Sequence, residues 1–186
     1  DKTVKPGVSF VLAVRSVLDR CASVNQASKN IAEMHASACA NFLLADRTGD
    51  MAVAEVSPDM VMIRRPKDGD NFIVCTNHFV LPEMQQYEDL ERRKIENWDT
   101  IPRYNAISEG LRRTGRKMNM TAAQQIMSDH TGYVCSHQSK IKLGTLWSIT
   151  AGLKNLDVFR AEGNPCRTKY KEDRRLKTAV QHALKE

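Results

Sequence analysis

Three short apolar runs, separated by turn residues, follow one another in the first third of the chain. They cover residues 41–45, 51–56 and 60–63. The first two flank a turn that ends at Gly49, where glycine suits the positive φ of a hairpin. Several of the runs are apolar on both faces, which is typical of strands covered on both sides. The pattern predicts an antiparallel meander inside a core, with a fourth strand over residues 72–76.

Helical patterns flank this meander. Residues 8–20 predict a helix whose first two turns are apolar on nearly every side, and such a helix is usually buried between layers. A second helix is expected after Ser23, which stands three residues before Gln26 as in a capping box. Further helices are predicted around residues 101–111 and after Thr121, a candidate N-cap.

A final hairpin is expected over residues 145–161, before a charged tail. Strands grouped between groups of helices indicate an α+β fold rather than an alternating parallel sheet. Two-sided burial of the strands favours sheets stacked between helical layers. With 186 residues and 41% hydrophobic content, we expect a single domain over residues 1–186. Because the chain begins with Asp1 and not Met, we expect that domain to be incomplete.

Composition narrows the functional classes. No apolar run approaches the roughly 18 to 20 residues of a membrane-spanning helix. Five cysteines without tight spacing argue against a disulfide framework and favour a reducing, cytoplasmic setting. The net charge is +6, and residues 166–186 form a basic tail. Basic segments can bind nucleic acid, but no aromatic residues alternate with these charges, so a solvated, partly helical tail is favoured.

The sharpest local feature is Asn77, at the expected end of the fourth strand. Such a position holds a side chain at the rim of a sheet, where binding sites are often built. The amide N–H of an asparagine there can stabilise a developing oxyanion. Alternatively, Asn77 caps the strand through a hydrogen bond to the backbone, and spacing alone favours that interpretation.

Cysteine and histidine also occur close together twice, as Cys75 with His78 and as Cys135 with His137. Two Cys and two His could bind zinc. However, a Cys-x-His pair is not a usual zinc motif, so buried structural cysteines are favoured and we predict no metal and no cofactor. A Cys/His nucleophile pair within the chain is also open on these residues, although nothing indicates a lowered thiol pKa.

Arg103 lies at the start of a predicted helix. A guanidinium group is unfavourable near a helix N-terminus, so a specific partner for it is plausible. A solvated arginine explains the sequence equally well.

Several short motifs, taken in order, resemble the C-terminal part of the linear-amide C–N hydrolases. This N-terminal-nucleophile group includes choloylglycine hydrolases and the isopenicillin-N acyltransferase-like proteins. The resemblance implies the C-terminal portion of a four-layer αββα sandwich. The motifs occupy residues 41–46, 54–56, 75–79, 130–132, 135–137, 145–148 and 161–165.

The resemblance also implies a mechanism. In this group an N-terminal cysteine attacks an amide carbonyl while its own α-amino group serves as the base, and water or an amine then resolves the acyl-enzyme. Asn77 resembles the asparagine of the oxyanion hole, and Arg103, more loosely, an arginine beside the nucleophile. His78 and Phe79 are expected to bind substrate. Because His78 is shared with the acyltransferase-like branch, bile salts are not the favoured substrates.

The chain departs from the group's pattern in one major respect. The nucleophilic cysteine belongs to an N-terminal region that this sequence does not contain, so we expect the chain alone to be inactive. Its expected partners are that missing segment, a small acyl-amide substrate and copies of itself. A non-catalytic interaction domain with the same sandwich is the alternative, and a basic nucleic-acid-binding module is a weaker one.

Overall fold

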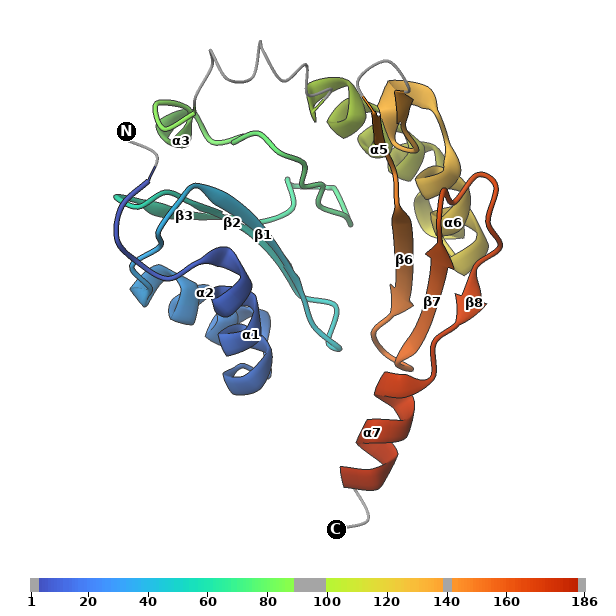
Figure 1. Ribbon diagram of the computed structural model, residues 1–186, viewed down its shortest axis with the longest axis horizontal. Helices are drawn as coiled ribbons and strands as arrows, with labels where there is room; N and C mark the ends of the chain where they lie inside the picture. Colours follow the sequence, from blue (N-terminus) through green and yellow to red (C-terminus); the bar gives the residue numbers. More distant parts are fainter. Residues whose placement is uncertain (1–3, 89–99, 139–141, 184–186) are drawn as a thin grey trace. The chain divides into compact units, whose positions relative to one another are not determined.

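The computed structural model describes residues 4–88, 100–138 and 142–183, and every structural statement below refers to them. The chain combines helices with antiparallel sheets, in agreement with the predicted α+β class. It divides into two compact units, residues 1–100 and 101–186, which are described separately (Figure 1).

The first unit is built on the predicted meander. Its three strands pair antiparallel in the order β1-β2-β3, and Gly49 adopts a φ of 93° in the first turn. Helices α1 and α2 cover one face of the sheet, and the segment from residue 72 to 81 crosses the other (Figure 1). The elements are α1 (Phe10–Arg20), α2 (Val24–Glu33), β1 (Ala40–Ala45), β2 (Met51–Val56), β3 (Val61–Arg64) and α3 (Pro82–Gln85).

The helix-facing core forms where α2 packs on the sheet. Ile31 contacts Ala54 and Val56, and all three are at most 2% exposed. The predicted start of α2 is confirmed. The hydroxyl of Ser23 accepts the N–H of Gln26 at 3.3 Å, and the Gln26 amide oxygen accepts the N–H of Ala22 at 2.7 Å.

Two expectations for this unit are wrong. The helix over residues 8–20 is not buried all round, because only Ala13 of α1 is buried and side chains such as Phe10 and Leu18 are more than 60% exposed. Residues 72–76 do not form a strand. The carbonyl of Val74 instead accepts a hydrogen bond from the guanidinium of Arg64, so a side chain takes the place of a neighbouring strand.

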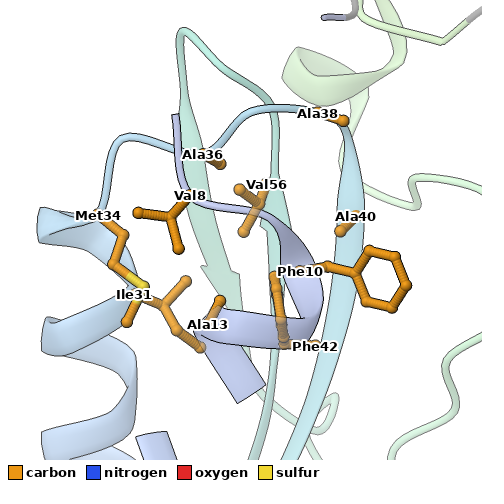
Figure 2. Close-up of a pocket in the computed structure, with 10 residues that line it drawn as sticks. All are labelled: Val8, Phe10, Ala13, Ile31, Met34, Ala36, Ala38, Ala40, Phe42 and Val56. Carbon is orange, nitrogen blue, oxygen red and sulfur yellow. The ribbon is translucent and has the colours of Figure 1, made fainter. Parts of the chain in front are cut away.

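A small apolar cavity lies between α1, α2 and the first two strands (Figure 2). Its volume is about 10 Å³, roughly the space of one water molecule. The ring of Phe10 points away from the other side chains that line it (Figure 2). The cavity is therefore a packing gap in the core and is too small for a substrate.

The second unit places helices beside a twisted hairpin. Strands β6, β7 and β8 pair antiparallel in that order, which confirms the predicted hairpin and brings part of the basic tail into the sheet. Thr121 is not the cap of its helix, because the side chain of Asn119 accepts the N–H of Ala122 at 2.9 Å. The elements are α5 (Thr100–Thr114), η1 (Gly115–Lys117), α6 (Met120–Ser128), η2 (Thr131–Tyr133), β4 (His137–Gln138), β5 (Leu143–Gly144), β6 (Trp147–Gly152), β7 (Asp157–Glu162), β8 (Lys171–Glu172) and α7 (Arg175–Ala183).

Among the described residues, no helix combines the length and apolar character required to cross a membrane.

Candidate functional site

The predicted site residue Asn77 lies in a loop that crosses the open face of the β1–β3 sheet. Asn41 and Glu55 stand opposite each other in the register of β1 and β2. Directly paired residues of antiparallel strands point to the same face, and both of these side chains hold the loop. The amide nitrogen of Asn41 donates to the carbonyl of Thr76 at 3.0 Å and to that of His78 at 2.9 Å.

Glu55 fixes the second half of the loop from a position that is fully buried. Its carboxylate accepts the backbone N–H groups of Val80 at 2.9 Å and Leu81 at 3.0 Å. The same carboxylate forms an ion pair with Arg64 at 2.7 Å, and Arg64 in turn donates to the carbonyl of Val74 at 2.6 Å. Burying a charge is costly unless it has such a partner and such hydrogen bonds.

Thr100, the last residue of the first unit and the first of α5, holds the apex of the loop. Its hydroxyl accepts the N–H of Asn77 at 2.8 Å and lies 3.0 Å from Nδ1 of His78. The hydroxyl of Thr76 donates to the carbonyl of Thr100 at 3.1 Å and lies 3.1 Å from the same imidazole nitrogen. The backbone on both sides of Asn77 is therefore fixed before any ligand arrives.

The other predicted site residues have different surroundings. The Asn77 side chain is exposed, His78 is half-buried and Phe79 is buried. Phe79 therefore contributes packing in this arrangement, and the substrate-binding roles of His78 and Phe79 remain predictions. Arg103 is half-buried in α5 and belongs to the second unit, so its role beside a nucleophile also remains a prediction.

Cys75 does not have the properties of a nucleophile. Burial raises the pKa of its thiol to about 11, the nearby Glu55 adds to this rise, and Arg64 opposes it. The thiol donates to the carbonyl of Thr76 at 3.6 Å. A nucleophilic thiol needs a lowered pKa, so these surroundings argue against catalysis by Cys75.

The second Cys/His pair belongs to a larger cluster. The Sγ of Cys135 lies 3.6 Å from Nε2 of His137, which lies 3.0 Å from Sγ of Cys166. The ring of His130 meets that of His137 edge to face, with centroids 5.2 Å apart. The structure thus groups one of the two pairs noted in the sequence, Cys135 and His137, with His130 and Cys166. The other pair, Cys75 and His78, is not part of this cluster.

Electrostatics favour the uncharged forms of Cys135 and His137. Burial is the main cause that raises the pKa of the Cys135 thiol. Loss of water contact lowers the pKa of His137, and the positive charge of Arg167 and the neighbouring His130 act in the same direction.

The sequence did not reveal the residues that position the Asn77 loop: Asn41, Glu55, Arg64 and Thr100. One signal was available for Glu55, since a carboxylate inside the apolar run 51–56 requires a buried partner. Nothing in the sequence marked Thr100, which stands 23 positions after Asn77.

Comparisons with known proteins agree with the resemblance seen in the sequence. A comparison with curated proteins finds no match. The family model described as acyl-coenzyme A:6-aminopenicillanic acid acyl-transferase matches residues 1–167, which is most of the 186-residue chain. The suspected relationship to the acyltransferase-like branch is thus confirmed, and the chain belongs to the acyl-coenzyme A:6-aminopenicillanic acid acyl-transferase family.

Proposed function

We propose that this chain provides the oxyanion-binding side of an acyl-transfer site that acts on linear amides, as a hydrolase or an acyltransferase. One observation carries the proposal. The loop around Asn77 is held by a buried carboxylate, an amide and a hydroxyl from three other parts of the unit, while Asn77 itself is exposed. Catalytic hydrogen-bond donors are most effective when they are fixed in advance in this way.

The chemistry follows from that placement. A thiolate adds to the carbonyl carbon of the substrate, and the carbonyl π electrons move onto oxygen. The Nδ2–H of Asn77 donates to this oxyanion. The oxyanion then collapses and the C–N bond breaks. The nitrogen takes up the proton that the cysteine's α-amino group removed from the thiol, and it leaves as an amine. Water or a second amine attacks the resulting thioester and regenerates the thiol.

We further propose that the thiol comes from polypeptide preceding this chain, as the resemblance implies. The surroundings of Cys75, the thiol nearest to Asn77 in sequence, support this, because burial keeps it protonated. The proposed whole protein is the αββα sandwich, with its N-terminal segment as the partner of this chain. The acyl group and the acceptor amine would be small molecules, of which an acyl-coenzyme A with an amine is the first pair to assay. With this donor the C–S bond breaks in place of the C–N bond, and the coenzyme A thiol leaves with the proton.

The test is to replace Asn77→Ala in the protein that contains this chain together with its N-terminal cysteine. We expect kcat to fall by roughly ten- to a thousandfold, the usual loss for one oxyanion donor. The matched control is Asn71→Ala, which removes another exposed asparagine of the same unit and should leave kcat unchanged. Urea denaturation of both variants verifies that each is folded.

Two results would overturn the proposal. An unchanged kcat in folded Asn77→Ala would remove Asn77 from the site. If mass spectrometry of the wild-type protein, mixed with acyl donors, detects no acyl group on any cysteine, the chain is instead a non-catalytic interaction domain.

A further inference from the structure

We propose that His130, Cys135, His137 and Cys166 bind a zinc ion in the second unit. Each residue offers one ligand atom, and the four atoms lie within 4.8 Å of one another. Two thiols and two imidazoles form one of the usual ligand sets of structural zinc sites. The proposal is independent of the acyl-transfer site, because all four residues lie outside the Asn77 loop.

The separations between ligand atoms agree with a tetrahedral ion. With Zn–S bonds of about 2.3 Å and Zn–N bonds of about 2.0 Å, ligand atoms of a tetrahedron stand about 3.3 to 3.8 Å apart. The two sulfur-to-nitrogen distances around His137 are 3.6 and 3.0 Å. Because all four ligand atoms lie within 4.8 Å of one another, no separation exceeds the ideal range by more than about 1 Å, which a small rotation of a side chain can close.

The backbone brings the first ligands together through a tight reversal. Gly132 has a φ of 59° and Tyr133 one of 62°, both in the left-handed region. Tyr133 is strained there, because a residue with a bulky side chain is rare in this conformation. The N–H of Cys135 donates to the carbonyl of Asp129 at 2.7 Å, which closes the turn and returns Cys135 toward His130.

Gly132 is required at this reversal for a second reason. A Cβ atom at this position would lie 2.3 Å from the carbonyl oxygen of Pro102 in α5. The turn that carries the first two ligands is therefore packed tightly against a helix.

The loop carrying Cys166 is held independently of the other ligands. The Asn164 side chain donates to the carbonyl of Thr145, while the backbone carbonyl of Asn164 accepts the N–H of Thr168 at 2.9 Å. The hydroxyl of Ser128, at the end of α6, lies 3.2 Å from the carbonyl of Pro165 and donates to it. These contacts fix the loop that carries Cys166, whose Sγ lies 3.0 Å from Nε2 of His137.

Charge balance also suits zinc. Binding converts the two thiols of Cys135 and Cys166 to thiolates and releases two protons to solvent, so that Zn²⁺ and two thiolates form a neutral complex. A neutral complex is compatible with the nearby positive charge of Arg167. With four protein ligands the site is closed, which indicates a structural rather than a catalytic role.

A structural ion has a clear use here. Few apolar side chains are fully buried in the described part of the second unit, among them Val134 and Ala161. Small units with limited cores are commonly stabilised by a metal or a disulfide. A disulfide between Cys135 and Cys166 is the competing interpretation, but it does not account for the two imidazoles gathered beside the thiols.

The test measures zinc in the reduced full chain, purified without a chelator. We expect about one zinc per chain by elemental analysis, and at least a tenfold loss of bound zinc in Cys166→Ser and His137→Ala. The controls Cys21→Ser and His182→Ala remove the same residue types outside the cluster and should keep the metal. The variant His130→Cys should also keep it, because three Cys and one His is another usual zinc set.

A readout on the wild-type chain covers the case in which variants fail to fold. Cobalt(II) added to metal-free protein should give the visible bands of a tetrahedral site with thiolate ligands. Wild-type protein that binds neither zinc nor cobalt when reduced would overturn the proposal. So would peptide mapping that finds Cys135 and Cys166 joined as a disulfide in protein purified under reducing conditions.

Discussion

Removing the buried carboxylate of Glu55 should destabilise the first unit strongly. In Glu55→Ala, the guanidinium of Arg64, whose side chain is 10% exposed, loses its ion-pair partner. The N–H groups of Val80 and Leu81 lose their acceptor at the same time. Breaking a buried pair by removing one partner costs about 3 to 5 kcal/mol. Each unsatisfied buried N–H adds about 1 to 3 kcal/mol, unless the loop moves to reach water.

We therefore expect the free energy of unfolding to fall by about 3 to 5 kcal/mol, since partial detachment of the loop limits the loss. Urea denaturation followed by circular dichroism measures the change. Glu33→Ala is the matched control, because Glu33 is exposed at the end of α2 and should change stability by less than about 0.5 kcal/mol. A loss below about 1 kcal/mol for Glu55→Ala would refute the view that this carboxylate holds the loop.

Two further predictions concern Cys75 and Asn119. Folding raises the pKa of the Cys75 thiol from 9.0 to about 11, so the folded state favours the neutral thiol. The free energy of unfolding should therefore fall as the pH rises from about 9 to 11. In urea titrations at several pH values, Cys75→Ala should flatten this dependence. An equal slope in both proteins would contradict the burial of that thiol. Asn119→Ala removes an N-cap and should lower the free energy of unfolding by about 1 kcal/mol, whereas Thr121→Ala should lower it clearly less. Equal losses of stability for the two variants in urea denaturation would show that the cap is misassigned.

The parts of the fold that the sequence predicted are those set by local chemistry. The hairpin turn at Gly49 and the Ser23 cap each depend on a few adjacent residues, and both are confirmed. The error over residues 72–76 has the opposite cause. An apolar run indicates a strand only if another strand is available for pairing, and here the side chain of Arg64 occupies the carbonyl of Val74.

The candidate site divides in the same way. Asn77 could be identified from its position in the sequence and from the family resemblance, but the residues that hold its loop could not be identified in this way. The supporting residues are distant from Asn77 in the sequence, by 36 positions for Asn41, 22 for Glu55 and 23 for Thr100. Their contacts depend on the register of β1 and β2 and on the hydrogen bond between Thr100 and Asn77, which only the folded chain forms. The Cys/His cluster shows a related limit. Cys135 and His137 are two positions apart in sequence, whereas Cys166 reaches them only through the loop after β7.

The energetics of the buried ion pair between Glu55 and Arg64 also indicate why a charged residue occupies position 55. Replacing a buried ion pair with apolar side chains of similar volume is often neutral or stabilising, so stability alone does not require Glu55 and Arg64. Apolar replacements, however, could not accept the N–H groups of Val80 and Leu81, and the loop would be free to adopt other paths. We infer that the carboxylate serves to position the loop, in addition to the stability that is lost when it is removed alone. On this reasoning Glu55→Gln, which retains an acceptor oxygen, should disturb the loop less than Glu55→Leu even where their free energies of unfolding are similar.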